Sequence, residues 1–246
     1  MRKGLSQQAS VDLYWLPLGA GGRFVRLNGR IFEAVLARLE KRQTKDLYHS
    51  ALVVRLPEGE FVIEQAPIRD GDGALRGVVA EGAVGSRWAR PLRMFRYEIR
   101  CWRNGVIPDV DEAVDSPQRL TEDPFLAQRV LELVPDVPTP VWGRDELHAG
   151  EMWNSNSLIS WLLVRSGLGD EAAHPPAGGR APGWRAGLVV AGRPHSLPDN
   201  VLKGELRASN AGKSDNLHES HVALARRDAD PACREVGDDL RRIATI

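Results

Sequence analysis

Three residues of this chain have the types that together perform acyl transfer. His49 and Glu64 lie in two short apolar runs, and Ser155 lies in the polar run 154–157 directly before a third apolar run. A serine hydroxyl attacks an amide or ester carbonyl when a histidine accepts its proton and a carboxylate orients the imidazole. These residue types predict a hydrolase or acyltransferase with Ser155 as nucleophile, His49 as base and Glu64 as the orienting acid.

The elements around these residues predict how they meet. Residues 48–55 and 60–65 have the composition of two strands, and the Leu-Pro-Glu-Gly sequence between them predicts a hairpin loop. His49 enters one strand and Glu64 leaves the other, so we expect the two side chains to lie close together. Residues 158–165 form an apolar helix that ends before Gly167. Ser155 precedes this helix, where the dipole favours a developing anion and backbone N–H groups can hold it.

The remaining pattern predicts an α+β fold with an antiparallel sheet. Further strands are expected at residues 11–16, 23–26, 94–102 and 187–191, and further helices at 31–42 and 124–134. Thr121 is the expected cap of the 124–134 helix, with Glu122 and Asp123 in its first turn.

The three motifs, taken in this order, resemble the permuted papain-like superfamily, which includes lecithin–retinol acyltransferase and relatives of NlpC-type cysteine peptidases. In that superfamily a histidine begins a strand, as His49 does in residues 49–54. An acid or histidine occupies the position of Glu64 in a motif like residues 61–67, and the nucleophile begins a late helix, as in 154–157. The chain also resembles a set of actinobacterial proteins to which we assign no role. The resemblance implies a permuted papain-like domain over residues 10–191.

Where the superfamily has cysteine, this chain has Ser155. Two functions therefore stay open. One is an amide or ester hydrolase or acyltransferase whose substrate contacts the residues around the nucleophile, namely Trp153, Asn154, Asn156 and Ser157. The other is a catalytically inactive binding domain, a pseudoenzyme that kept the fold and lost the thiol. Ser155 or Ser157 could also serve only as the cap of the helix, since serine is a preferred N-cap residue.

Arginines and aromatic residues alternate between positions 87 and 103. From residue 95 onward Phe95, Tyr97, Ile99 and Cys101 share one face of a strand, which predicts that Cys101 is a core residue. The arginines and Glu98 on the other face are expected to be solvated, with an acidic ligand as one alternative. Nucleic acid is not expected as a partner.

Composition excludes several classes of protein. Lys+Arg and Asp+Glu each total 33, so the 246-residue chain has no net charge and is not a polycation for nucleic acid or anionic membranes. Its two cysteines, Cys101 and Cys233, are too few for a disulfide framework or a cysteine-rich zinc site. The histidines other than His49 are scattered, so neither a metal nor a cofactor is expected. No signal peptide or membrane span is found, and a cytoplasmic protein is expected.

The aromatic residues predict the domain boundaries. Every Trp, Tyr and Phe lies at or before Trp184. Because aromatic side chains dominate core burial, the packed domain is expected to cover residues 10–191. Residues 1–9 and 192–246 are then expected to be a flexible N-terminus and a flexible polar tail.

Overall fold

A six-stranded antiparallel sheet forms the centre of the protein, with strand order β4-β5-β3-β2-β1-β6. The computed structural model describes residues 8–18, 41, 43–68, 77–169 and 173–194. The strands are β1 (Ser10–Pro17), β2 (Tyr48–Leu56), β3 (Gly59–Pro67), β4 (Val78–Ala83), β5 (Arg96–Arg103) and β6 (Gln118–Thr121). The α-helices are α2 (Pro124–Leu133), α3 (Ser155–Ser166) and α4 (Trp184–Ala191), and the short 3-10 turns are η1 (Arg87–Ala89), η2 (Arg93–Phe95), η3 (Val110–Glu112) and η4 (Val134–Asp136). The expected α+β class with an antiparallel sheet is confirmed.

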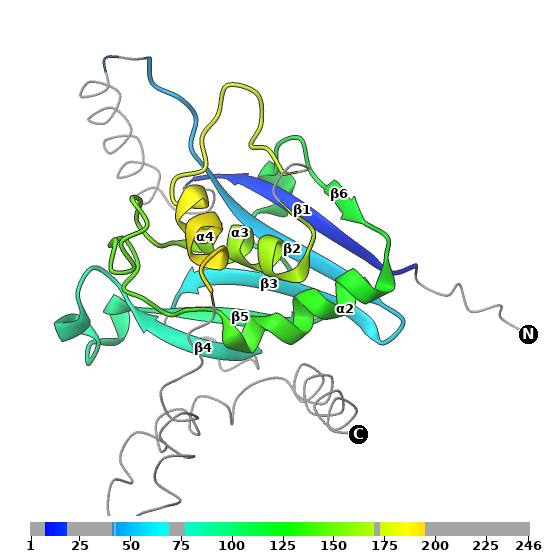
Figure 1. Ribbon diagram of the computed structural model, residues 1–246, viewed down its shortest axis with the longest axis horizontal. Coiled ribbons are helices and arrows are strands. Elements are labelled where there is room, and N and C mark those ends of the chain that lie inside the picture. The colour runs from blue at the N-terminus through cyan, green and yellow to red at the C-terminus, as the bar shows by residue number, and fades with distance from the viewer. Residues whose placement is uncertain (1–7, 19–40, 42, 69–76, 170–172, 195–246) are drawn as a thin grey trace, which may run out of the picture.

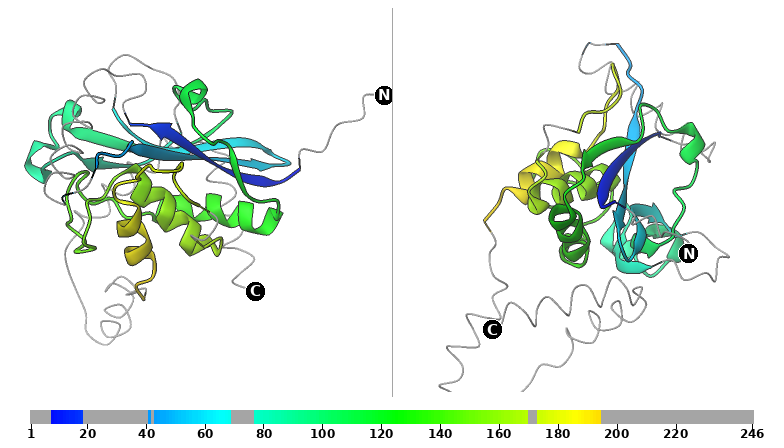
Figure 2. Two further views of the ribbon diagram at one scale, coloured as in Figure 1. Left: turned by 90° about the horizontal axis from the view of Figure 1, so that it is seen from above. Right: turned by 90° about the vertical axis from the view of Figure 1, so that its right-hand side faces the viewer.

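The α-helices of the described residues, α2, α3 and α4, cover one face of the sheet, which we call the helix face (Figure 2). Strand residues that point to it include Leu13, Leu52, Ile63 and Ile99, and they share one apolar core with the helices. The other face, called here the opposite face, carries a smaller cluster that includes Leu16, Val53 and Val62, packed with Ile107 from the segment after β5. Successive side chains of a strand point to opposite faces, so residue number along each strand decides which layer a side chain enters.

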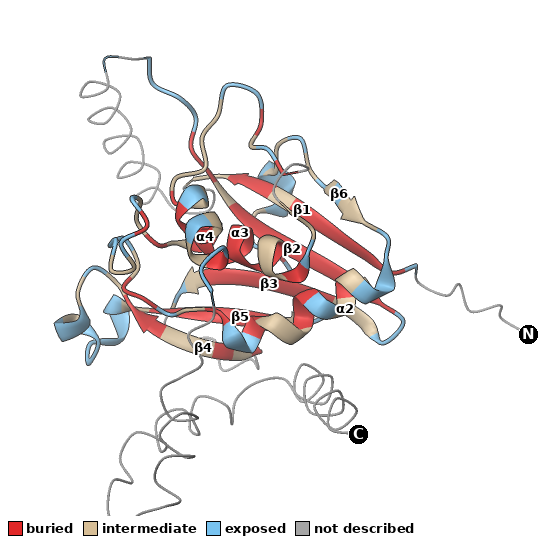
Figure 3. Cartoon of the chain, viewed as in Figure 1, coloured by how far each residue is buried: buried red, intermediate tan, exposed pale blue. Residues whose placement is uncertain are grey.

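Helix α3 lies at the centre of the helix face. Ten of its twelve residues are buried, which is why its apolar residues do not form a single stripe. Gly167, in the left-handed conformation with φ 92°, ends the helix as expected. Figure 3 shows α3 largely buried beside α4.

Several expected elements are confirmed. The strand at 11–16 is β1, and the hairpin is β2 and β3, in which Leu56 already pairs with Gly59. The strand expected at 94–102 begins later, at Arg96, because the chain up to Phe95 is in η2. Cys101 is fully buried in the core, as expected.

Two local expectations are wrong. The cap of α2 is Asp123, whose carboxylate accepts a hydrogen bond from the Phe125 backbone N–H, whereas Thr121 Oγ1 accepts from the Asp123 N–H. Residues 187–191 belong to helix α4 and not to a strand. Gly187 lets this helix approach α3 closely, because a β-carbon there would collide with Ser157 and Ser160. The helix therefore gains its stability from close packing on α3, which the run 187–191 does not reveal.

Other expectations fall on residues outside the described part of the chain. These are the strand at 23–26, the helix at 31–42 (only residue 41 of it is described), residues 1–7 of the N-terminus and residues 195–246 of the tail. Within the described ranges, none of the helices has the length and apolar character to cross a bilayer.

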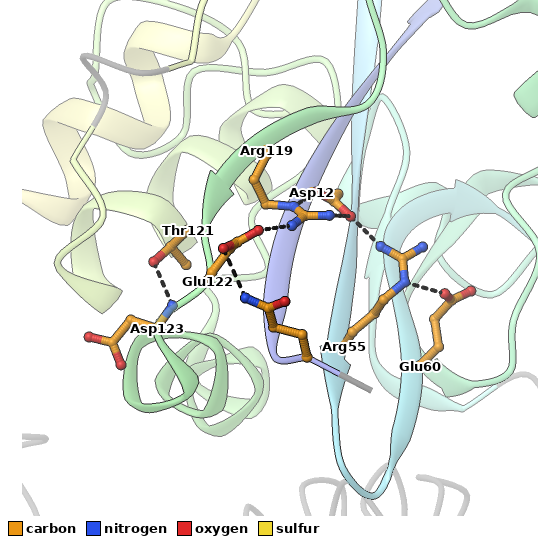
Figure 4. Close-up of polar contacts among 8 residues, drawn as sticks. Asp12, Arg55, Glu60, Arg119, Thr121, Glu122 and Asp123 are labelled. Carbon is orange, nitrogen blue, oxygen red and sulfur yellow. Dashed lines mark hydrogen bonds and ion pairs between the residues drawn. The ribbon is translucent and has the colours of Figure 1, made fainter. Parts of the chain in front are cut away.

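A buried carboxylate fixes the edge strand β6 to β1. Asp12, 1% exposed, forms ion pairs with Arg55 of β2 and with Arg119 of β6. Arg55 also pairs with Glu60 at 2.8 Å, and Arg119 with Glu122 at 2.6 Å. Figure 4 shows the resulting chain of alternating charges across four strands. Burial removes water from the Asp12 carboxylate, and these two guanidinium groups stabilise its charge in place of water.

Substituting Asp12→Asn should lower the free energy of unfolding by about 2 kcal/mol, because both guanidinium groups lose a charged partner. Urea denaturation of parent and variant measures the difference. Glu122→Gln is the matched control: that side chain is about half exposed, and its loss should cost less than about 0.5 kcal/mol. Equal effects of the two substitutions would contradict the role given to Asp12.

Candidate functional site

The first turn of α3 is closed by a capping box. The Asn154 side chain accepts hydrogen bonds from the backbone N–H of Asn156 at 2.9 Å and of Ser157 at 3.4 Å, and Ser157 Oγ accepts from the Asn154 N–H at 3.1 Å. The N-cap is therefore Asn154 and neither of the serines considered for it. Two backbone donors at the helix start are already bonded, so they are not free to hold an oxyanion.

Asn156 joins α3 to two distant parts of the chain. Its Nδ2 donates to the Tyr48 carbonyl of β2 and to the Pro182 carbonyl, both at 2.9 Å. Its Oδ1 accepts from Ser50 Oγ at 2.9 Å. The side chain is 2% exposed, and all three bonds are made inside the protein. Asn156, expected from sequence to contact substrate, holds the helix to β2 in this structure.

Other polar side chains of the first turns bind the segment that leads into α4. Asn154 Nδ2 donates to the Pro182 carbonyl at 2.8 Å, and Ser157 Oγ donates to the Gly183 carbonyl at 2.7 Å. Ser160 Oγ donates to the Trp184 carbonyl at 2.7 Å. These bonds satisfy backbone carbonyls where α4 begins, so these serine and asparagine side chains connect α3 to α4.

Ser155 is the first residue of α3 and is 5% exposed. None of the hydrogen bonds among the described residues involves its hydroxyl. The residue lies on the helix face, because α3 covers that face and the next residue contacts Ser50 of β2. The expected position of Ser155 at a helix start is thus observed.

His49 lies on the opposite face of the sheet. It is paired in register with Leu16, which belongs to the opposite-face cluster, while its neighbours Tyr48 and Ser50 contact the helix layer. The backbone of the sheet therefore separates the imidazole from Ser155. Burial lowers the pKa of His49 to about 4, against a smaller rise from the Asp109 carboxylate, so the imidazole is neutral at pH 7.

Glu64 also points to the opposite face, in register with Arg100 of β5. Its Oε1 accepts from Arg100 Nη1 at 2.9 Å, and Glu98 Oε2 accepts from Arg100 Nε at 2.9 Å. All three side chains are at most 9% exposed. The expectation that Glu98 and Arg100 form a solvated face is wrong, because the three charges neutralise one another in part and tolerate burial together. His49 and Glu64 share a face, yet the charged partner of Glu64 is Arg100.

Gln65 is the residue that the sequence analysis missed. It follows Phe61 and Ile63 on the helix face and is in register with the core residue Ile99. The side chain is 4% exposed, and among the described residues neither its Oε1 nor its Nε2 has a hydrogen-bond partner. A polar residue at an apolar position of the alternating strand was the available signal. Buried amides without partners are rare in folded proteins and invite an explanation.

The surroundings of Gln65 differ from those of a regular strand pair. The pairing of β2 with β3 ends at Leu52 and Ile63, two residues before Gln65, whereas β3 remains paired with β5 as far as Pro67. Figure 1 shows β2 and β3 diverging on the side where α3 and α4 lie. Gln65 therefore does not pair with β2, and its side chain lies on the helix face.

Trp153, the residue before the cap, carries another buried polar group without a partner in the described part of the chain. Its side chain is 1% exposed within the same apolar core as Ile63 and Ile99, and its Nε1–H donates to no acceptor there. Trp153 and Gln65 thus bring an indole donor and a complete amide into one layer of the protein.

Among the described residues no cluster of three or more histidine, cysteine or acidic side chains is arranged for a metal.

Comparisons with known proteins return no match. No family model, no curated protein and no solved structure is similar enough to this chain to be reported.

The depressed pKa of His49 predicts a pH-dependent stability. Between pH 6.5 and about 4 the unfolded chain binds a proton at this histidine and the folded chain does not, so the free energy of unfolding should fall as the pH is lowered. The contribution lost by pH 4 is up to about 3 kcal/mol. His49→Gln should remove that part of the decline in denaturation curves measured across this range. His148→Gln, which removes an exposed imidazole, should retain the slope of the parent, and a parental slope in His49→Gln would refute the assignment.

Proposed function

We propose that this chain is a non-catalytic binding domain of papain-like architecture that binds an amide-containing ligand on the helix face through Gln65. The order of strand, hairpin, further strand and late helix supports the permuted papain-like assignment, as does a capped helix start on an antiparallel sheet. The observation that carries the binding function is the buried, unpartnered amide of Gln65.

The positions of the three sequence motifs favour binding over catalysis. Serine must lie within hydrogen-bond reach of its base for proton transfer during attack. Ser155 and His49 are on different faces of the sheet, and Glu64 accepts a charged hydrogen bond from Arg100. Because the imidazole of His49 points to the other face of the sheet, no proton acceptor from the predicted triad stands beside Ser155. The pseudoenzyme alternative fits these positions.

An amide is the ligand group that matches Gln65 best. The side chain offers a carbonyl acceptor and an N–H donor side by side, and a primary carboxamide offers the same pair in reverse order. Two parallel hydrogen bonds would satisfy both orphaned groups at once. An ester has the carbonyl but no N–H, so it would leave Gln65 Oε1 unsatisfied.

The cost of keeping Gln65 supports a binding role. An unsatisfied buried amide destabilises a fold by about 1–3 kcal/mol, and any aliphatic side chain of similar size would avoid that cost. The Nε1–H of Trp153 adds a further group that a polar ligand in the same layer could use. The proposed site therefore offers groups that recognise a ligand through hydrogen bonds and has no attacking nucleophile.

Ser155 should show no nucleophilic reactivity. A fluorophosphonate probe should label the parent protein and the Ser155→Ala variant to the same extent at neutral pH, as read by intact mass. Loss of labelling in Ser155→Ala would restore the hydrolase or acyltransferase hypothesis. Ser155→Cys tests the surroundings of this position separately. A thiol beside a base would react rapidly with an electrophilic probe, and we expect no reaction faster than that of an ordinary unactivated thiol.

Gln65→Met should raise the free energy of unfolding of the ligand-free protein by about 1 kcal/mol, because it removes two unsatisfied polar groups at similar volume. Gln118→Met is the matched control. Gln118 Oε1 accepts from Trp15 Nε1 at 3.1 Å and its Nε2 donates to the His174 carbonyl at 3.1 Å, so that substitution should destabilise. Urea denaturation measures both.

The same variant tests binding. In an NMR titration with N-acetyl-L-alaninamide, the side-chain amide signals of Gln65 should shift, and the methyl ester of N-acetylalanine should shift them less. Gln65→Met should abolish the response of neighbouring backbone signals. Unchanged Gln65 signals with both compounds, or an undiminished response in Gln65→Met, would refute amide recognition at this residue.

A further inference from the structure

Residues 84–95, which connect β4 to β5, form an exposed lobe that we call the Arg–Trp knob. Four large apolar side chains of the knob are exposed: Trp88 (94%), Met94 (74%), Leu92 (58%) and Phe95 (37%). Figure 3 shows the lobe as the exposed end beyond β4 and β5, and Figure 1 shows it projecting from the body of the fold. The other exposed large apolar residues of the described chain are separate in sequence, at Val106, Val110, Phe125 and Val189. A concentration of this kind marks an interaction surface.

The backbone of the knob is ordered by its own hydrogen bonds. The Val84 N–H donates to the Phe95 carbonyl at 2.7 Å, so the two ends of the knob are hydrogen-bonded to each other. Between them η1 and η2 form two short turns. The Gly85 N–H donates to the Trp142 carbonyl at 2.9 Å, and Arg144 Nε donates to the Gly85 carbonyl at 2.7 Å. The apolar side chains are thus presented on a fixed backbone, so binding requires little further ordering of the chain.

The charge of the knob is positive. Arg87, Arg90 and Arg93 are all exposed, and residues 84–95 contain no aspartate or glutamate. Arg87 forms an ion pair with Glu146 at 2.8 Å, at the base of the knob. Arginine is therefore interleaved with exposed apolar groups over one short projection, although the whole chain carries no net charge.

We propose that the Arg–Trp knob binds the surface of an anionic lipid bilayer. Trp88 and Met94 enter the boundary between headgroups and acyl chains, while Arg90 and Arg93 contact lipid phosphates. Tryptophan favours this boundary. Basic residues beside apolar ones bind anionic membranes through burial of apolar surface and through electrostatic attraction to the lipids. The convex shape favours a bilayer over a protein, because a fluid surface yields to a projection and a protein partner would need a matching cavity. This inference is independent of the function proposed for Gln65.

The test is co-sedimentation of the full chain with vesicles of phosphatidylcholine containing phosphatidylglycerol. The parent should bind these vesicles, should bind pure phosphatidylcholine far more weakly, and should dissociate as salt is added. Trp88→Ala should weaken binding at least about tenfold, as expected for losing a buried aromatic side chain. Arg90→Gln should weaken binding and reduce its dependence on salt.

Phe125→Ala is the matched control, since Phe125 is an aromatic residue 67% exposed at the start of α2, outside the knob. It should bind as the parent does. Trp88→Ala should keep the melting temperature of the parent, because the indole packs on almost nothing. The proposal is overturned if the parent does not bind anionic vesicles, if it binds neutral vesicles equally well, or if Trp88→Ala and Phe125→Ala bind alike.

Discussion

The arrangement of this protein depends on how the first turn of α3 is satisfied inside the core. A helix start brings unbonded N–H groups, and burying them is tolerated only where acceptors are supplied. Asn154 and Ser157 supply them through the capping box. Asn156 then connects the helix to Tyr48 of β2 and to Pro182, and Ser157 connects it to Gly183. The central helix, the sheet and α4 are therefore fixed to one another by one polar turn surrounded by apolar packing.

The alternation of strand side chains decides which chemistry the fold supports. The step of one residue from His49 to Ser50 moves a side chain from one layer to the other, so the serine of β2 meets α3 and the histidine does not. The same rule places Glu64 with Arg100 on the opposite face and Gln65 on the helix face. As a result the ionised groups gather where they can neutralise one another, and a neutral amide is left in the apolar layer.

Gln65 and the Arg–Trp knob depart from ordinary burial in opposite directions. Gln65 keeps a polar group in the core without partners, whereas the knob keeps large apolar groups in water. Each carries an energetic cost within the isolated chain. Such departures are expected where a protein meets another molecule, because the missing contacts are then supplied by the ligand or the surface. The two features occupy different layers of the molecule and support separate proposals.

The sequence alone determined the elements whose signals are local. Strand alternation and the Leu-Pro-Glu-Gly connection defined the β2–β3 hairpin, and Gly167 marked the end of α3. The tertiary structure decided what depends on partners far along the chain. The run 187–191 belongs to a helix that Gly187 allows to pack closely against α3, and Arg100 is buried because two acids on neighbouring positions neutralise it. Local sequence patterns reveal the periodicity of apolar residues and the ends of helices. Strand pairing decides which face a side chain enters and which charges it meets there. That is why the candidate residues were visible in the sequence and their separation across the sheet was not.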